Sequence, residues 1–195
     1  MTPSIKGIGM QLAIDGLHRV MESGLLTREQ LEVRLQPSDL QILDDKIVPG
    51  LWYPIDTCGR LIEVAVESEE KNRADFLVRV GTLVAAELFS SEIYQNFISS
   101  AEKWGARSGK VMLGLTRLVL NFGEWSYDPG PPDGDWFTVE AAESEALPEV
   151  LRHIGQGSIA YLASRINKRE VPVTSERPSP DRIVYRGWRN GIVPS

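Results

Sequence analysis

Cysteine and histidine are nearly absent from this chain. Its 195 residues include one cysteine, Cys58, and two histidines, His18 and His153. A single cysteine forms no internal disulfide, and so few ligands do not complete the usual zinc sites built from Cys and His. Cys58 shares an apolar helix face with Ile55 and Ile62, which predicts a buried thiol that packs like a small hydrophobic side chain. The sequence therefore predicts no bound metal.

Long apolar runs and an excess of basic residues are also missing. No window approaches the roughly 18 apolar residues of a membrane span, and no targeting segment is visible at the start. The chain has 27 acidic and 21 basic residues, a net charge of −6, which argues against binding to nucleic acid or to an anionic membrane. No asparagine lies in a glycosylation sequon. We therefore expect a cytoplasmic protein with no membrane span and no nucleic-acid partner.

The first two thirds of the chain have the hydrophobic period of α-helices. Met10, Ile14, Leu17 and Met21 follow helical spacing, and similar stripes recur between turn residues. With 42% hydrophobic residues, a chain of this length can bury a substantial core. Helices are predicted at about residues 10–21, 27–35, 55–65, 77–88, 91–104 and 111–122.

After Phe122 the hydrophobic period changes from about 3.6 to 2, the signal of a change from helix to strand. Strands are predicted at 124–128, 136–142, 170–174 and 182–188, with a helix at 147–166 between the two pairs. Segment 128–135, rich in Pro and Gly, connects the first pair of strands, and segment 175–180, which contains two prolines, connects the second. The predicted order is therefore ββαββ.

These elements predict one α+β domain over residues 1–195. An N-terminal helical layer, residues 1–121, packs on a four-stranded antiparallel sheet formed within residues 122–190. The helix between the hairpins should cover one face of the sheet. The opposite face is then expected to receive the N-terminal helices.

The segment Ile47-Val48-Pro49-Gly50-Leu51-Trp52-Tyr53-Pro54, the helical run after it, and the ββαββ tail from Gly123-Glu124-Trp125 resemble a bacterial family. This family is related to the heme-NO-binding and 4-vinyl reductase domains, whose fold is shared by transport-protein-particle subunits. The resemblance implies a helical layer on a four-stranded sheet, with a small or lipid-like ligand between them. It also implies a role as a sensor or adaptor in signalling.

Two departures from that family bear on cofactors. The final hairpin, residues 173–185, has no cysteine, whereas many 4-vinyl reductase domains carry metal-binding cysteines there. Heme-binding relatives need an axial histidine and a Tyr-x-Ser-x-Arg cluster, and this chain lacks the cluster, while His153 belongs to the late helix. We therefore expect no heme and no other cofactor.

No pair of residues indicates a catalytic centre. Acidic side chains such as Asp56 and Glu63 belong to solvated faces, and nothing ties two of them to one pocket. His153 and Ser158 are five positions apart on one helix and diverge by about 140°. The sequence thus favours a protein that is not an enzyme, with an enzyme on the same fold as the least favoured alternative.

Aromatic residues are the first candidate site. Packing in the core explains them most simply, but large amphipathic rings also line ligand pockets. If a pocket lies between the helices and the sheet, its predicted lining is Trp52, Tyr53, Tyr94, Phe97 and Trp104.

Charge is the second candidate signal. Residues 122–149 contain eight acids and no base, and residues 165–190 contain seven bases and three acids, a net charge of +4. The two blocks either pair within the sheet, where such pairs contribute about 0–1 kcal/mol each, or form surfaces that steer a protein partner. The predicted partner-binding residues are Asp133, Asp135, Arg182, Arg186 and Arg189.

The function most favoured by the sequence and the resemblance is a non-enzymatic signalling adaptor or sensor that acts through protein–protein contacts. The first alternative is a sensory domain that binds a small molecule or lipid in an apolar pocket. The expected partners are a protein of unknown identity, with a second copy of this chain and a small apolar ligand left open.

Overall fold

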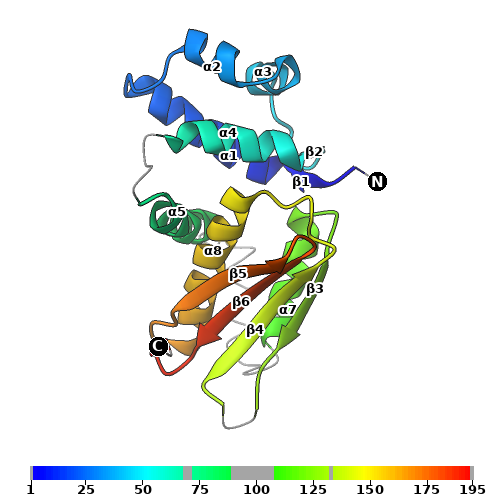
Figure 1. The fold of residues 1–195 in the computed structure, drawn as a ribbon, viewed down its shortest axis with the longest axis vertical. Helices are drawn as coiled ribbons and strands as arrows, with labels where there is room; N and C mark the ends of the chain where they lie inside the picture. The colour runs from blue at the N-terminus through cyan, green and yellow to red at the C-terminus, as the bar shows by residue number, and fades with distance from the viewer. Residues whose placement is uncertain (1, 68–71, 89–107, 132–133, 194–195) are drawn as a thin grey trace.

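The computed structural model describes residues 2–67, 72–88, 108–131 and 134–193. A two-stranded sheet and a group of helices form the N-terminal part, shown in blue to green in Figure 1. Its elements are β1 (Ser4–Lys6), α1 (Gly7–Glu22), α2 (Arg28–Arg34), α3 (Pro37–Asp44), β2 (Trp52–Pro54), α4 (Ile55–Ala65), α5 (Arg73–Leu88) and α7 (Ser108–Val119). The β1–β2 pair was not predicted, because three-residue strands are too short to show a period.

The C-terminal part confirms the predicted ββαββ order. Two hairpins flank one long helix and form a four-stranded antiparallel sheet of order β3-β4-β6-β5. The elements are β3 (Glu124–Asp128), β4 (Trp136–Ala142), α8 (Glu149–Asn167), β5 (Val173–Ser179) and β6 (Arg182–Trp188). The predicted α+β class, with helices packed on a four-stranded antiparallel sheet, is confirmed.

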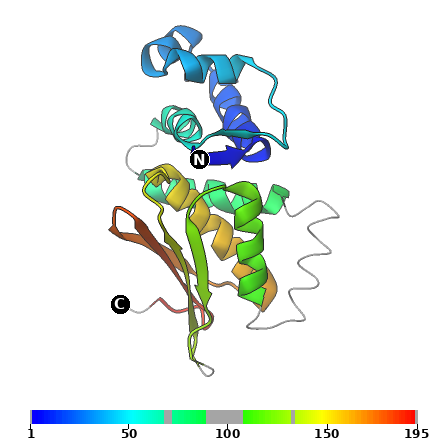
Figure 2. The same ribbon diagram turned by 90° about the vertical axis from the view of Figure 1, so that its right-hand side faces the viewer.

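The helices cover a single face of this sheet. The register pairs Tyr127 with Val139 and Val139 with Tyr185, so both tyrosines point to the same side. The Tyr127 ring lies against Gly109 of α7, and the Tyr185 hydroxyl lies against Gly155 of α8. In Figure 2 none of the described helices lies on the opposite face of the sheet, which is called the outer face below. The expectation that the N-terminal helices occupy the second face is therefore wrong, since α5 and α7 pack on the same side as α8.

Strand β5 begins and ends later than predicted. The expected strand at 170–174 is observed at Val173–Ser179, and the predicted connection contributes most of it. The ladder with β6 changes register between Glu176 and Ser179. That irregularity lets an edge strand contain Pro178, which has no N–H to donate. The helix predicted at 91–104 lies outside the described residues.

Two hydrophobic clusters form the interior, and α8 contributes to both. Helices α1–α4 surround Met10, Leu17 and Leu61, which are fully buried, and Val150 of α8 belongs to this upper cluster. The inner face of the sheet forms the lower cluster, in which Ala163 of α8 is buried. Cys58 is buried in the upper cluster as predicted, and burial raises the pKa of its thiol to about 12.

A buried ion pair fixes α3 to α4. The carboxylate of Asp39, which has no exposed surface, accepts two hydrogen bonds of 2.7 Å from Arg60 and one of 2.7 Å from the Thr57 hydroxyl. Burial acts to raise the pKa of Asp39. Hydrogen bonds from Arg60, from Thr57 and from the Gln36 N–H outweigh it and hold that pKa below its usual value.

Helices α5 and α8 cross in direct backbone contact. A Cβ atom at Gly81 would lie 2.0 Å from the carbonyl oxygen of Ile154, and one at Gly157 would lie 1.9 Å from that of Val78. The Ser158 hydroxyl is 3.0 Å from the carbonyl oxygens of both Gly81 and Ile154, and donates between them. The absence of a side chain at both glycines is thus what permits this packing.

We expect Gly81→Ala and Gly157→Ala to destabilise the protein strongly. The added methyl group meets backbone atoms that cannot rotate away, so the cost should reach at least the roughly 1–3 kcal/mol of an overpacked core. Gly16→Ala in α1 is the matched control, because no atom lies within 4 Å of the new Cβ and removing a helical glycine stabilises by about 0.5–1 kcal/mol. Urea unfolding followed by circular dichroism measures both; equal stability of Gly81→Ala and Gly16→Ala would contradict the crossing.

Candidate functional site at the start of helix α8

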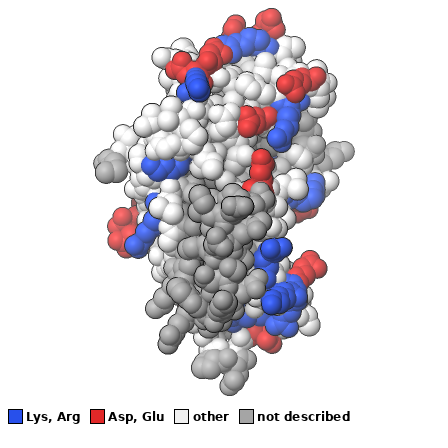
Figure 3. Space-filling view, turned by 180° about the vertical axis from the view of Figure 1, so that it is seen from behind, with Lys and Arg blue, Asp and Glu red and all other residues white. Residues whose placement is uncertain are grey.

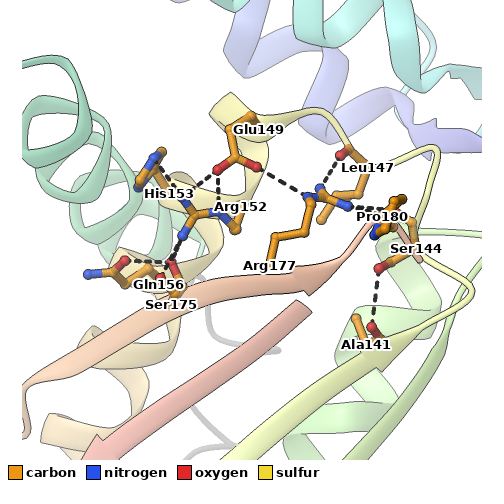
Figure 4. Close-up of polar contacts among 10 residues, drawn as sticks. All are labelled: Ala141, Ser144, Leu147, Glu149, Arg152, His153, Gln156, Ser175, Arg177 and Pro180. Carbon is orange, nitrogen blue, oxygen red and sulfur yellow. Dashed lines mark hydrogen bonds and ion pairs between the residues drawn. The ribbon is translucent and has the colours of Figure 1, made fainter. Parts of the chain in front are cut away.

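A network of polar side chains lies where α8 meets the sheet edge and the β4–α8 connection (Figure 4). At its centre is Arg152, whose residue exposure is only 9%. Its Nε donates to Glu149 over 2.6 Å, and its Nη1 donates to the Ser175 carbonyl over 2.7 Å and also to the Ser175 hydroxyl. Because a buried guanidinium is costly unless its donors are satisfied, these contacts are what allow Arg152 to be inside.

Strand β5 is at the edge of the sheet, and side chains of α8 bond the carbonyls that would otherwise face a further strand. The Trp188 N–H donates to the Pro172 carbonyl, so in the alternating antiparallel pattern the carbonyls of Val173 and Ser175 point away from β6. Gln156 donates to the Val173 carbonyl over 2.8 Å, and Arg152 donates to that of Ser175.

The spacing of the two elements explains this match. Residues four apart on a helix are separated by about 6 Å along its axis, and residues two apart on a strand by about 6.7 Å. Arg152 and Gln156 therefore reach successive outward carbonyls of β5. The Ser175 hydroxyl completes the contact by donating to Gln156 Oε1 over 2.7 Å.

Glu149 and Arg177 join this network to the turns above it. Arg177 donates to Glu149 over 3.3 Å and to the carbonyls of Leu147, Pro180 and Ser144 over 2.6, 2.8 and 3.2 Å. Burial acts to raise the pKa of Glu149, but the hydrogen bonds and charges of Arg152 and Arg177 outweigh it, so the pKa lies below its usual value. The carboxylate is thus ionised and bridges two arginines.

His153 contacts the same guanidinium. Arg152 Nη2 lies 3.0 Å from His153 Nε2. Burial, followed by the charge of Arg152, lowers the pKa of His153. The ring is therefore neutral near pH 7 and accepts a hydrogen bond at Nε2, since an arginine only donates.

The network has the geometry of a structural junction and not of a nucleophile with its base. The Ser175 hydroxyl gives its proton to Gln156, and the Nε2 lone pair of His153 faces Arg152. Among the described residues, no group of three or more His, Cys, Asp and Glu side chains could hold a metal ion. In that part of the chain, no helix is long and apolar enough to cross a membrane.

The two histidines do not fit an axial heme ligand. His18 is exposed on α1. His153 has its Nε2 occupied by a cation, which opposes bonding to iron. Since the sequence has no third histidine, the chain does not supply the ligand that heme-binding relatives need.

Two of the predicted ligand-binding residues lie together in the β1–β2 sheet. Trp52 is 41% exposed, and the Lys6 ammonium lies 3.9 Å from the centre of its ring. The Tyr53 hydroxyl accepts a hydrogen bond of 2.9 Å from the Val48 N–H. The other three, Tyr94, Phe97 and Trp104, are outside the described residues, so the predicted lining remains a hypothesis.

Two of the predicted partner-binding residues, Arg182 and Arg186, project from β6 on the face of the sheet opposite Tyr127 and Tyr185. Arg182 makes two hydrogen bonds of 2.7 and 2.8 Å to Glu140, and Arg186 pairs with Glu176 at 2.9 Å. Arg189 instead donates to the carbonyls of Gly134, Trp136 and Pro129 and to the Tyr127 hydroxyl, and so holds the β3–β4 hairpin. Asp135 is exposed at that hairpin, and Asp133 is not among the described residues.

Sequence reasoning missed two buried donors on the inner face of the sheet. Trp125 and Tyr185 stack with ring centres 6.3 Å apart. Neither Trp125 Nε1 nor the Tyr185 hydroxyl has a hydrogen-bond partner within the described parts of the chain, and burial raises the pKa of Tyr185. Period-two alternation placed both residues on strands, but no sequence signal shows that their polar atoms are left unpaired.

Charge on the back of the molecule is mixed over the α1–α4 end, where Figure 3 shows basic and acidic side chains interspersed. Lower on the same face, at the right of the view, several basic side chains lie side by side. Exposed pairs such as Arg28 with Asp44, at 2.7 Å, account for part of the mixed charge over α1–α4.

Comparison with known proteins shows the fold of this chain. No protein-family model matches it, and no curated protein matches its sequence. Solved structures of H-NOX domains do match. A variant H-NOX protein from K. algicida, in the Fe(II) unliganded form, is 11% identical with a TM-score of 0.64, and the match covers 94% of this chain and 96% of that one.

Two further structures agree. A variant of the T. Tengcongensis H-NOX is 17% identical with a TM-score of 0.61, covering 94% of this chain and 97% of that one. An oxygen-binding H-NOX domain related to soluble guanylate cyclases is 17% identical with a TM-score of 0.55, covering 94% of each. The chain thus has an H-NOX-like fold over almost its whole length, as the resemblance to heme-NO-binding domains implied.

We expect Arg152→Met to destabilise the protein by about 1–3 kcal/mol, the scale for leaving a buried acceptor without its donor. The Ser175 and His153 acceptors and the Glu149 carboxylate all lose a donor, while Met keeps much of the side-chain volume. Arg169→Met is the control, because Arg169 is exposed. Chemical denaturation compares the two variants; a loss no larger than that of the control would contradict the assigned role of Arg152.

Proposed function

We propose that this chain is a non-catalytic sensory or adaptor module that acts through protein–protein contacts and does so without heme. The H-NOX-like fold supports the sensory part, since matched structures include an oxygen-binding domain related to soluble guanylate cyclases. The histidine environments support independence from heme. We also propose, from the resemblance of the sequence, that this chain is related to the 4-vinyl reductase domains.

The observation that carries the protein-contact proposal is that no helix in the described part of the chain covers the outer face of the four-stranded sheet (Figure 2). Trp136 at one end of this face is 39% exposed. Arg182 and Arg186, which project from β6 on the same face, are half exposed in their pairs with Glu140 and Glu176. Aromatic and arginine side chains are enriched in protein interfaces. Exposed ion pairs worth about 0–1 kcal/mol can be exchanged for pairs with a partner at little cost.

The same face is not suited to nucleic acid. Its two arginines are each paired with a glutamate, and Glu124 and Asp128 of β3 add further exposed acids. Phosphate binding depends on a net positive surface. We therefore place a protein partner on this face, with Arg186 and Trp136 as its main contacts.

Arg186→Glu should abolish partner capture while leaving the fold intact, because the pair with Glu176 is exposed and contributes little to stability. Trp136→Ala should weaken the same capture. Immobilised protein is incubated with lysate of the source cells, and bound proteins are identified by mass spectrometry. Arg28→Glu, which breaks the exposed pair of Arg28 with Asp44 in the helical layer, is the control and should retain the partner. Capture that is equal for Arg186→Glu and Arg28→Glu would remove the sheet face from the proposal.

A second candidate function is binding of a small apolar ligand between the helices and the sheet. Within the described residues, Trp125 Nε1 and the Tyr185 hydroxyl have no hydrogen-bond partner, which favours this function. A buried polar group without a partner costs about 1–3 kcal/mol, and a ligand with an acceptor atom would recover that cost. An apolar ligand with one such oxygen is the chemistry these two donors fit.

Native mass spectrometry of the purified protein tests this candidate. The wild type should carry a bound mass that Tyr185→Phe loses, because that variant removes one of the two donors. Tyr127→Phe is the matched control, since the Tyr127 hydroxyl is already bonded to Arg189. A wild type without bound mass, together with a Tyr185→Phe variant that is equally or more stable, would eliminate the ligand.

A further inference from the structure

The contact between Arg152 and His153 can exist in only one protonation state. A guanidinium donates five hydrogen bonds and accepts none. The 3.0 Å approach of Arg152 Nη2 to His153 Nε2 therefore needs a lone pair on that nitrogen. The single ring proton must lie on Nδ1, and a second proton on Nε2 would set two donors and two positive charges against each other.

The groups around His153 come from two helices. On α8 they are Arg152 and Glu149, and on α5 they are Arg73 and Asp75. Burial is the largest influence and lowers the pKa of His153. Arg152 and Arg73 lower it further, and Glu149 and Asp75 oppose them without reversing the direction. Glu149 is also the acceptor for Arg177, so it is not free to neutralise an imidazolium.

The same guanidinium is what holds the free edge of the sheet. Arg152 Nη1 bonds the Ser175 carbonyl on the outward side of β5, while Gln156 bonds the Val173 carbonyl independently of the histidine. A proton on His153 Nε2 therefore acts on one of two adjacent edge contacts. The other contact, from Gln156 to the Val173 carbonyl, involves no atom of Arg152 or His153.

We propose that His153 is a proton-operated switch on the edge of the sheet: protonation at Nε2 removes the acceptor from Arg152, sets two positive charges in contact, and releases the Arg152 contact with Ser175. The step transfers one proton from solvent to His153, and no covalent bond changes. It is independent of the proposed function, because it requires only the contacts of α8 and β5.

The sign of the pH dependence follows from linkage. The pKa of His153 in the folded protein is lower than in the unfolded chain, where it is about 6.5, so the unfolded chain binds more protons between these two values. The free energy of unfolding therefore falls as pH decreases from about 7 toward the folded pKa. Below the folded pKa this contribution is lost in full and the curve is flat.

NMR titration of the isotope-labelled full chain from pH 8 to pH 5 tests the switch. At pH 8 the ring nitrogens of His153 should show the Nδ1–H form. On acidification the amide signals of Thr174, Ser175 and Glu176 should shift with the midpoint of His153. Their hydrogen exchange should become several-fold faster, after correction for the intrinsic pH effect.

His153→Gln is the informative variant, because its amide oxygen can accept from Arg152 but does not titrate. The shifts in β5 should disappear in this variant and persist in His18→Gln, which changes the exposed histidine on α1. Titration of His153 in the wild type without movement of the β5 signals overturns the proposal. An Nε2–H form of the His153 ring at pH 8 also overturns the proposal. Both of these outcomes are read from spectra of the wild type, so the test remains decisive if His153→Gln fails to fold.

Discussion

The backbone contact between α5 and α8 is the constraint on which the rest of the structure depends. Two glycines that face carbonyl oxygens at contact distance set how closely the helices approach and at which residues they cross. That position carries the start of α8 to the edge strand β5 and its later turns over the inner face of the sheet. A wider crossing would withdraw Arg152 and Gln156 from the β5 carbonyls. The polar network therefore depends on a packing contact between two glycines and backbone carbonyl groups.

Helix α8 also couples the two hydrophobic clusters. Val150 belongs to the cluster of α1–α4, and Ala163 belongs to the cluster against the sheet. Because one rigid helix is buried in both, its displacement exposes apolar surface in both parts. The Glu149, Arg152 and Arg177 network lies between them and connects α8 to the turns that precede it and to the β5–β6 hairpin. The upper helices and the sheet thus share an element, although their cores are distinct.

The sequence predicted what depends on local patterns and missed what depends on distant contacts. Period-two alternation around Trp125 and the Pro- and Gly-rich turn after Asp128 sufficed for the first hairpin, and the ββαββ order followed. The prediction that the N-terminal helices pack on the second face of the sheet was wrong. Strand alternation shows that a sheet has two faces, but it does not show which helices pack on each face. The first and last residues of β5 were predicted wrongly because a proline such as Pro178 is typical of a turn. In the structure, a change of register lets the strand contain it. In the candidate site, the partner of Arg152 is Ser175, and no periodicity links residues in a helix and a later strand.

The contacts along β5 have a consequence for self-association. An unpaired strand edge presents carbonyl and N–H groups to which a strand from another molecule can add, a common route to aggregation. Here Arg152 and Gln156 occupy two outward carbonyls of one edge, and Pro178 interrupts its hydrogen-bonding pattern. The opposite edge, β3, exposes the carboxylates of Glu124 and Asp128, whose like charges repel a second copy. The two borders of the sheet are thus protected from strand addition by different means, steric cover on one side and charge on the other, which leaves the broad outer face as the part of the sheet open to contact.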